Sequence, residues 1–370
     1  MPTPIKIAYF ITPHGFGHAS RAAAVMIALR QHIPAVRFEL FTTSPEWIFS
    51  DSLQAAFGYH ALQPEIGMVQ TSPLEADLGA TCDFLDQHLP FDSRLVAGLA
   101  RQLEALNCGL VICDIAALGI AAARQAGIPS ILIENFTWDW IYQAHVAAAP
   151  RLQAPVDYFT KLYAQADYRI QTQPLCRPVD GAMQVGPISR RPRTTPEQIR
   201  YRLEIPENAP VVLVTMGGFT DGFAFLKHLP SRLAAYLVIP GAQNLDADHD
   251  QVLALPTRSD LFHPDLVQAA DLVIGKAGYS TIAEIYMAGT PFGFISRPGS
   301  RESAALMDFA TRHLSCRPIS PQDYAGGRWI RQLPELLALP RTRSRKENGA
   351  DEAARFIAEK LGLSGTGADQ

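Results

Sequence analysis

Short apolar runs alternate along the chain with stretches in which apolar residues recur at helical spacing. Each run is followed by a glycine or polar turn, which is the strand, turn and helix order of parallel sheets. In the first half, the pattern predicts strands at 5–12, 36–42, 109–113 and 130–133, and helices at 19–30, 91–106 and 118–126. In the second half, it predicts strands at 210–215, 235–239, 271–274 and 291–295, and helices at 222–228, 265–270, 281–288 and 302–310. The fold class predicted is α/β, with two open parallel sheets.

The segment from Gln173 to Pro210 separates the two halves. It contains seven prolines, which interrupt long regular elements, so it is predicted to link two domains. We predict a first domain over 1–186, a second over 187–340, and a C-terminal segment over 341–370 with a helix from about Lys346 to Leu361 and a disordered tail. Ligands of such sheets bind at the carboxyl ends of the strands, so a cleft between the domains is the expected site.

Length and composition support this organisation and exclude several classes. A chain of 370 residues exceeds what one core usually organises. A formal net charge of −4 without a long basic block argues against nucleic acid and membrane surfaces as partners. The five cysteines are scattered, with no CxxC pair, which disfavours a zinc site or disulfide framework. With no apolar stretch of 18 residues, no integral membrane segment is expected, and the expected location is cytoplasmic.

The first predicted strand runs into the glycine turn HGFGH. The spacing GxGxxS from Gly15 nearly matches a dinucleotide fingerprint, but Ser20 replaces the third glycine. The acid expected about twenty residues later has only Glu39, in mid-strand, as a candidate, so this interpretation is disfavoured. An imidazole at a helix start can take a proton from an attacking hydroxyl, and His18 is therefore predicted to be a general base. The alternative is that His14 and His18 only bond the backbone of the turn.

The most informative stretch of the second half is DLVIGKAGYSTIAEIYMAGTPFGFISRP. A predicted strand ends in a turn where Lys276 adds positive charge and Gly278 gives backbone access, and Ser280 and Thr281 then open a helix. These features predict a cradle for a diphosphate. Glu284 is suited to accept hydrogen bonds from ribose hydroxyls, but Thr281-x-x-Glu284 is equally a capping box with a purely structural explanation.

Three further loops of the second half are candidates for contacts with the same ligand. They contain, in chain order, Gly217 and Gly218, Phe262 and His263, and Glu302 and Ser303. The first pair follows a predicted strand, the second precedes a helix and is suited to a flat base, and the third begins a helix. Ordinary turn and capping chemistry explains each of them equally well.

Together, the motifs HGFGHASR and ADLVIGKAGYSTIAEIYMAGTP resemble those of nucleotide-sugar glycosyltransferases of the GT-B fold, particularly the bacterial lipid II GlcNAc-transferase type and the UDP-glycosyltransferases. The segment GIPSILIENFTWDWIYQAHV, with the first motif, closely resembles the amino-terminal, glycosyltransferase-like region of plant L-arabinokinases. The resemblance spans residues 5 to about 310. It implies two Rossmann-like, doubly wound parallel-sheet domains that face a cleft.

The resemblance also implies residue roles. It assigns the general base to His18 and the ribose ligand to Glu284. It places Lys276, Ser280 and Thr281 at the diphosphate, Phe262 and His263 at the base, and Glu302 and Ser303 near the donor sugar. Many relatives have an acid followed by Gln in that last position, where this chain has Ser303, so the donor sugar stays open.

The acceptor side of the site is predicted in the first half. Asp114, at the end of the strand VICD, is expected to line this side and to be catalytic, and the other candidates are His14, Gly15, Gly17, Glu134, Asn135, Trp138 and Asp139. Aromatic faces stack on sugar rings and carboxylates bind hydroxyls, although packing between domains is an equal explanation for Trp138 and Trp140. Trp138-Asp139-Trp140 is not a DxD metal motif, and no metal or cofactor is expected.

The predicted function is an inverting, metal-independent transfer of a sugar from a nucleotide-diphosphate sugar, by preference a UDP-sugar, to an acceptor hydroxyl. One alternative is a GT-B epimerase that acts on a nucleotide sugar without an acceptor. Another is a non-catalytic module that binds a sugar or nucleotide sugar. The expected partners are small molecules, and the acceptor and the oligomeric state are left open.

Overall fold

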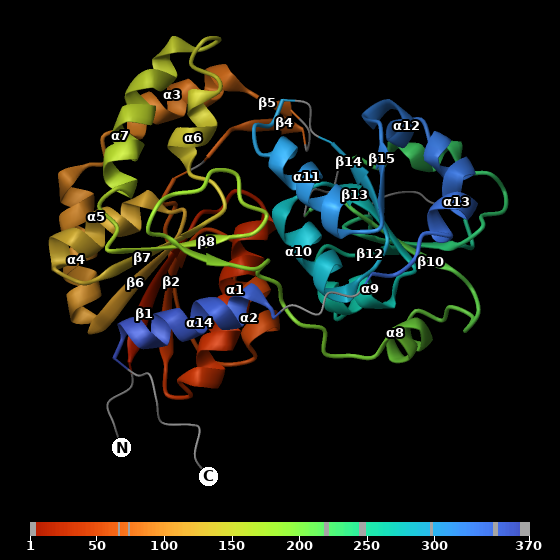
Figure 1. Ribbon diagram of the computed structural model, residues 1–370, viewed down its shortest axis with the longest axis horizontal. Helices are drawn as coiled ribbons and strands as arrows, with labels where there is room; N and C mark the ends of the chain where they lie inside the picture. Colours follow the sequence, from red (N-terminus) through yellow and green to blue (C-terminus); the bar gives the residue numbers. More distant parts are fainter. Residues whose placement is uncertain are drawn as a thin grey trace. The chain divides into compact units, whose positions relative to one another are not determined.

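The structure is a computed structural model that describes residues 5–65, 67–72, 75–217, 222–243, 249–296, 299–342 and 347–362. The chain forms two compact units. The first comprises Met1–Thr71, Ala76–Ile188 and Glu347–Gln370, and the second Ser72–Glu75 and Ser189–Lys346. Each unit is built on a parallel sheet with helices on both faces (Figure 1). The predicted α/β fold class with two parallel sheets is confirmed.

The sheet of the first unit has seven strands in the order β3-β2-β1-β6-β7-β8-β9. They are β1 (Lys6–Ile11), β2 (Arg37–Thr42), β3 (Gly58–Ala61), β6 (Cys108–Asp114), β7 (Ser130–Glu134), β8 (Tyr168–Thr172) and β9 (Met183–Val185), and all their pairings are parallel. A two-stranded ribbon, β4 (Gln70–Ser72) and β5 (Glu75–Ala76), is separate. The strand order reverses between β1 and β6, which is where open sheets of this kind bind ligands.

Alternate residues of β1 face opposite layers of helices. Ile7 and Tyr9 pack in a core with α1 (Phe16–His32), α2 (Glu46–Leu53) and α14 (Gly349–Lys360). Ala8 and Phe10 pack in the other core with α3 (Leu78–His88), α4 (Ser93–Ala105), α5 (Ala117–Ala126), α6 (Trp138–Gln143) and α7 (Gln153–Tyr163), and a short 3-10 turn (Pro150–Leu152) leads into α7. This alternation follows from the two-residue period of a strand buried on both faces.

The C-terminal helix belongs to the first unit. The helix predicted from about Lys346 to Leu361 is observed as α14, which lies beside α1 (Figure 1). Its first residue, Gly349, meets the carbonyl of Gly186 so closely that a Cβ there would stand 2.0 Å from the carbonyl oxygen. The Glu352 carboxylate accepts a hydrogen bond of 2.7 Å from the Gly186 N–H. The predicted disordered tail falls on residues 363–370, outside the described part of the chain.

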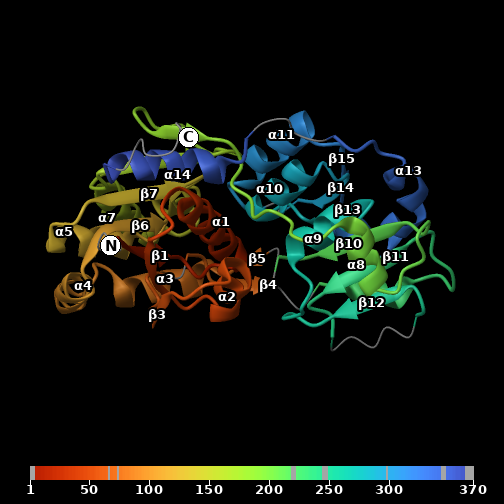
Figure 2. The ribbon, with the colours of Figure 1, turned by 90° about the horizontal axis from the view of Figure 1, so that it is seen from below.

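The second unit repeats this topology with six parallel strands in the order β12-β11-β10-β13-β14-β15. They are β10 (Val211–Thr215), β11 (Tyr236–Pro240), β12 (Val252–Leu255), β13 (Leu272–Lys276), β14 (Phe292–Ile295) and β15 (Cys316–Ile319). One face packs on α8 (Pro196–Arg202), α9 (His263–Ala269), α10 (Tyr279–Ala288) and α11 (Ser303–His313). The other packs on α12 (Pro321–Ala325), α13 (Leu333–Leu337) and 3-10 turns at Ala224–His228 and Arg328–Gln332. Figure 2 shows α9 and α10 on one side of these strands and α13 on the other.

Two predicted segments differ from the structure. The helix predicted at 222–228 is a 3-10 turn from Ala224 to His228. The predicted linker contains two regular elements, β9 and α8. Its prolines do not prevent α8, because Pro196 stands at the first position of that helix, where a proline costs no hydrogen bond. Thr195 and Gln198 close a capping box at the same helix start.

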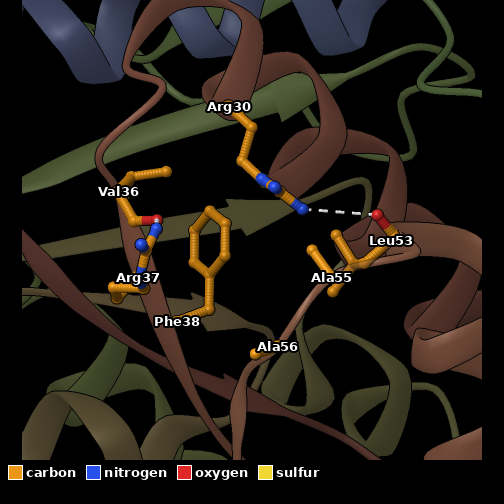
Figure 3. A pocket seen from close by; sticks show the side chains of 7 residues that line it. All are labelled: Arg30, Val36, Arg37, Phe38, Leu53, Ala55 and Ala56. Carbon is orange, nitrogen blue, oxygen red and sulfur yellow. Dashed lines mark hydrogen bonds between the residues drawn. The ribbon is translucent and has the colours of Figure 1, made fainter.

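A pocket of about 150 Å³ lies at the amino edge of the first sheet (Figure 3). It is lined by Arg30, Val36, Arg37, Phe38, Leu53, Ala55 and Ala56, and the Arg30 guanidinium donates to the Leu53 carbonyl at 3.3 Å. These residues come from the end of α1, the start of β2 and the end of α2. The pocket is therefore at the opposite end of the strands from the predicted site residues. None of the helices in the described ranges combines the length and apolar composition needed to cross a bilayer.

Candidate functional site

The first candidate site lies where β1 and β6 end, at the reversal of strand order. Gly15 precedes α1 with φ of 73° and ψ of 175°, a backbone conformation that only glycine adopts readily. The helix then begins at Phe16 and places His18 on its first turn. Asp114 is the last residue of β6, so the turn and the strand end bring the two predicted catalytic residues together.

His18 and Asp114 form a buried hydrogen-bonded pair. The distance from His18 Nδ1 to Asp114 Oδ1 is 2.7 Å, and the Asp114 side chain has no exposed surface. A carboxylate at Nδ1 assigns the ring proton to that nitrogen and leaves the lone pair on Nε2. Arg21 Nη2 also lies 3.2 Å from Nδ1, but a protonated Nδ1 offers it no acceptor. Among the described residues, no hydrogen bond of this ring involves Nε2, which leaves that nitrogen for a substrate.

Arg21 holds the same carboxylate from one helical turn further along α1. Its Nε donates to Asp114 Oδ2 at 2.8 Å and its Nη2 to Oδ1 at 2.6 Å. Its Nη1 donates to Asn135 Oδ1 at 2.7 Å, which ties the end of β7 to the pair. Burial raises the pKa of Asp114, but the charge and hydrogen bonds of Arg21 and His18 outweigh it, so the net pKa is lowered.

Sequence reasoning missed Arg21, although the signal was present in HGFGHASR. An arginine three residues after a histidine shares its helix face, and both side chains then point to the same strand end. Asn135, predicted for the acceptor side, is fully buried and serves as the partner of Arg21.

The aromatic candidates of the acceptor side are packed within the first unit. The Trp138 side chain is 1% exposed, and its ring contacts those of His14 and Tyr142 at centroid distances of 5.2 and 5.9 Å. A Cβ on Gly67 would meet the same indole at 2.4 Å. The Trp138 ring therefore packs inside the first unit. Neither of the two predicted roles, stacking on a sugar or packing between domains, matches these contacts. His14 is partly exposed and lies at the edge of this cluster.

The acidic candidates nearby are also buried and already have partners. Glu134 Oε1 accepts hydrogen bonds from Arg169 Nε at 2.9 Å and Gln171 Nε2 at 2.7 Å. Asp139 Oδ2 accepts from Thr160 Oγ1 at 3.0 Å, while its buried Oδ1 has no hydrogen-bond partner within the described residues. Gly17 continues the glycine turn into α1.

The second candidate site lies where β10 and β13 end, the corresponding reversal in the second unit. Gly217 follows β10 with φ of 69°, and an added Cβ there would stand 3.8 Å from Lys276 Nζ. Lys276 ends β13, and Gly278 is the N-cap of α10. Ser280 and Thr281 occupy the first turn of this helix, whose start carries partial positive charge. Gly218, predicted with them, lies outside the described residues.

Glu284 is occupied by two protein partners. Arg190 donates to Oε1 through Nε at 3.1 Å and Nη2 at 2.9 Å, and His263 Nδ1 lies 2.7 Å from Oε2. Burial raises the pKa of Glu284, but Arg190 and His263 lower it to a net value of about 2. The capping-box alternative is wrong, because α10 starts at Tyr279 and Glu284 lies in its second turn.

Two arginines flank the ring of Phe262, the aromatic residue predicted to contact the base of the nucleotide. The guanidinium carbons of Arg190 and Arg193 lie 4.9 and 4.2 Å from the centroid of the Phe262 ring. The Asp265 carboxylate accepts hydrogen bonds from the backbone N–H groups of Arg193 and Thr194 at 2.5 and 3.2 Å. The sequence analysis missed Arg190 and Arg193, because they lie about 70 residues from Phe262 in the chain.

The remaining donor-side candidates lie at the start of α11. Glu302 is the N-cap residue and Ser303 the first residue, and the Ser303 side chain is buried. They share the carboxyl edge of the second sheet with the β10 and β13 loops, since α11 follows β14. Within the described ranges, no group of three or more His, Cys, Asp or Glu side chains is arranged to hold a metal ion.

The arrangement of the two sheets is that of a known fold. Two parallel α/β sheets, each with a glycine turn where its strand order reverses, are the architecture of GT-B glycosyltransferases. The resemblance to this superfamily noted in the motifs is confirmed. No protein-family model matches the sequence.

Three curated relatives are similar in sequence. L-arabinokinase of Arabidopsis thaliana is 25% identical over 368 residues, which cover 96% of this chain and 34% of the relative, so the chain spans about a third of that protein. The uncharacterized glycosyltransferase MK0977 of Methanopyrus kandleri is 23% identical, over 75% of this chain and 84% of the relative. The UDP-N-acetylglucosamine–N-acetylmuramyl-(pentapeptide) pyrophosphoryl-undecaprenol N-acetylglucosamine transferase of Rippkaea orientalis is 33% identical, over 30% of this chain and 34% of the relative.

Solved structures show the same fold at low identity. MurG of Acinetobacter baumannii superimposes with a TM-score of 0.56 at 14% identity, over 96% of this chain and all of that chain. The glycosyltransferase of kitacinnamycin gives a TM-score of 0.61 at 17% identity, over 97% of this chain and all of that chain. UDP-GlcNAc 2-epimerase of Neisseria meningitidis gives 0.57 at 14% identity, over 96% and 99%. At these identities, the solved structures show the fold.

Proposed function

We propose that this protein transfers a sugar from a nucleotide-diphosphate sugar to an acceptor hydroxyl, with inversion and with His18 as the general base. The observation that carries the proposal is the 2.7 Å contact between His18 Nδ1 and Asp114 Oδ1 at the end of β6. It fixes the tautomer in which Nε2 accepts a proton, the one that a base requires. Asp114 is held as an anion by Arg21, so it stabilises the imidazolium that forms.

The chemical step follows from this geometry. His18 Nε2 takes the proton of the acceptor hydroxyl while its oxygen bonds to the anomeric carbon of the sugar. The bond between that carbon and the diphosphate oxygen breaks, and the nucleoside diphosphate leaves with the electron pair. Placing the two reactants together and stabilising the leaving diphosphate supply most of the acceleration. No step of this scheme requires a metal ion.

The donor is assigned to the carboxyl edge of the second sheet. Lys276 and the start of α10 supply positive charge for the diphosphate. Glu284 reaches a ribose only if the ribose replaces Arg190 or His263, since both carboxylate oxygens are bonded. Solved structures of similar fold were determined in complex with dTDP or bound to UDP-GlcNAc. These ligands support a nucleotide sugar as the ligand class. The identity of the nucleotide base is to be determined by experiment.

The test is turnover of UDP-, GDP- and dTDP-sugars with a panel of hydroxyl acceptors. Wild type is expected to release nucleoside diphosphate in the presence of an acceptor, and His18→Ala to lose this activity while still binding donor. His88→Ala is the matched control, because His88 is exposed on α3. Equal turnover in wild type and His18→Ala would exclude His18 as the base.

The same assay separates the competing functions. The fold is shared with UDP-GlcNAc 2-epimerases, and an epimerase interconverts the sugar of the donor without an acceptor. A non-catalytic module binds the nucleotide sugar and releases no nucleotide with any acceptor. Either result would replace the transferase proposal.

A further inference from the structure

Glu65 is a buried carboxyl beneath the first candidate site. It lies in the loop after β3 and is 5% exposed. Its Oε2 accepts a hydrogen bond of 3.1 Å from the backbone N–H of Ala117, the first residue of α5. Its Oε1 has no hydrogen-bond partner within the described residues. A buried carboxyl with one of its oxygens unpaired is costly, so its presence calls for a physical reason.

The backbone that Glu65 holds is strained. Ile115, between Asp114 and α5, has φ of 46°, a left-handed conformation that is a genuine outlier for a β-branched residue. Such conformations are unfavourable and persist only where the surroundings hold them. Here the Tyr163 hydroxyl donates to the Ile115 carbonyl at 2.8 Å, and Glu65 accepts from Ala117 two residues later. The strained turn directly follows Asp114, so what holds it also aims the Asp114 carboxylate.

Donor groups from two further loops surround the same carboxyl. The Thr12 hydroxyl, just after β1, and the Trp138 indole N–H, at the start of α6, both lie close enough to lower its pKa. Neither donor reaches hydrogen-bond geometry with Glu65 Oε1 or with any other acceptor among the described residues. The loop itself is fixed by the Tyr142 hydroxyl, which donates to the Gly67 carbonyl at 2.9 Å. Glu65 thus lies beside groups that follow β1, β6 and β7, the strands after or at whose ends His18, Asp114 and Asn135 stand.

The environment favours the neutral carboxylic acid. Burial raises the pKa of Glu65 to about 8, and the charge of Asp114 acts in the same direction. The titratable groups that interact with it include Asp114 and Cys113 on β6, Tyr142 on α6 and Tyr163 on α7. Each of them is neutral or negative at neutral pH, so an ionised Glu65 gains no compensating cation from them.

We propose that Glu65 is a positioning residue that, as a neutral acid, holds the strained turn at Ile115 and thereby aims Asp114 at His18. The neutral acid keeps an acceptor for the Ala117 N–H and adds one O–H donor, which the Thr12 hydroxyl is able to accept. Ionisation places a second negative charge near Asp114 and removes that donor. The expected effect on turnover rests on the proposed function. The role of Glu65 in holding the turn at Ile115 rests on the geometry alone.

The experiment compares wild type with Glu65→Gln and Glu65→Ala across pH 5 to 10. Gln keeps a neutral side chain with an acceptor for Ala117, whereas Ala leaves that N–H unbonded. The turnover number of wild type is expected to fall as pH rises through about 8, and that of Glu65→Gln to stay level there. Glu65→Ala is expected to lose about 10- to 100-fold in turnover number at every pH, with the donor KM nearly unchanged, because Asp114 is misplaced.

Two controls separate positioning from general loss of structure. Gly67→Ala disturbs the same loop by forcing a Cβ against the Trp138 ring, and its loss of turnover is expected to be independent of pH. Glu39→Gln replaces another glutamate of the first unit, which pairs with His60 at 3.0 Å and Lys6 at 3.7 Å. It is expected to keep the alkaline fall of wild type. Superimposable pH profiles of wild type and Glu65→Gln would overturn the proposal.

Unfolding provides a readout that does not depend on the reaction. The pKa of Glu65 is higher in the folded than in the unfolded chain, so wild type loses stability relative to Glu65→Gln as pH rises from about 5 to 8, and the gap is constant above that. If wild type turns over no nucleotide sugar but shows this gap, the proposed function fails and the assignment of a neutral Glu65 stands. A gap that does not change with pH would overturn that assignment.

Discussion

The Arg21 guanidinium binds both oxygens of the Asp114 carboxylate, at 2.8 Å from Nε and 2.6 Å from Nη2, with 1% of the Arg21 side chain and none of the Asp114 side chain exposed. The pair joins the first turns of α1 to the end of β6. A bidentate geometry of this kind fixes the direction of a carboxylate as well as its charge. Asp114 therefore presents Oδ1 to His18 in one orientation, while the arginine balances its charge.

Arg21→Met is expected to destabilise the protein strongly. It leaves Asp114 buried without its cation, a change that costs about 3–5 kcal/mol. Denaturant unfolding of the full chain measures the loss. Arg151→Met is the control, because Arg151 pairs with Asp83 and Asp86 on the surface and is 53% exposed, so its loss is expected to change stability little. Equal effects in the two variants would contradict the assignment of Arg21.

Asp114→Asn tests the orientation of the imidazole. Asparagine keeps one oxygen acceptor but carries no charge, so the imidazolium loses its counterion, and an amide NH2 turned toward Nδ1 moves the ring proton to Nε2. The transfer rate is therefore expected to fall by about 10²–10⁴-fold. Donor affinity is expected to stay the same, because the donor is assigned to the second unit. The double variant Arg21→Met/Asp114→Asn is expected to recover part of the stability lost in Arg21→Met but none of the rate. Recovery of the rate would show that Asp114 serves only the fold.

Most strands and long helices were predictable, because their signals are local. The strands at 5–12 and 130–133 are continuous apolar runs, and they are observed as β1 and β7 within one residue or two at each end. Strands such as β9 and β15 are short, partly exposed and contain a polar residue. Their pairing depends on the neighbouring strand, so no local pattern marks them.

The candidate site residues that lie in sequence motifs could be predicted. His18 and Asp114 each follow a strand of the same sheet, and the carboxyl ends of parallel strands meet at one edge. The partners of Glu284 were not predictable, since Arg190 lies 94 residues away and its approach depends on how the chain enters the second unit. Glu65 belongs to no motif, and the largest cause of its raised pKa is burial, which arises only in the folded chain.

Lys276→Ala tests the assignment of the diphosphate. Lys276 ends β13 beside Gly217, and removing its charge is expected to weaken binding of UDP by about tenfold, an effect that salt reduces. Calorimetric titration at two salt concentrations measures both effects. Lys227→Ala removes an exposed lysine of the same unit and is expected to leave the affinity unchanged. Equal affinity in Lys276→Ala and wild type would exclude Lys276 from the diphosphate site.

Glu284→Gln tests whether the Arg190–Glu284–His263 cluster stabilises the second unit. A carboxyl whose pKa falls from 4.5 in the unfolded chain to about 2 in the folded one contributes about 3 kcal/mol at neutral pH. Because the folded pKa is the lower one, this contribution is complete above about pH 5 and is lost as pH falls toward 2. The Gln variant lacks it at every pH. Its unfolding free energy is therefore expected to lie below that of wild type at pH 7, by a gap that closes in acid.

Acid unfolding of the two proteins, compared at matched denaturant concentrations, measures how that gap depends on pH. Glu335→Gln is the control, because Glu335 is exposed on α13, and it is expected to follow wild type closely. A gap that stays constant from pH 7 to 3 would mean that Glu284 is not held as an anion by Arg190 and His263. The carboxylate would then be open to a ribose, as the resemblance to glycosyltransferases first implied. The dependence of the gap on acid therefore decides between two roles of the Glu284 carboxylate. It either binds the hydroxyls of a ribose or stays bonded to Arg190 and His263.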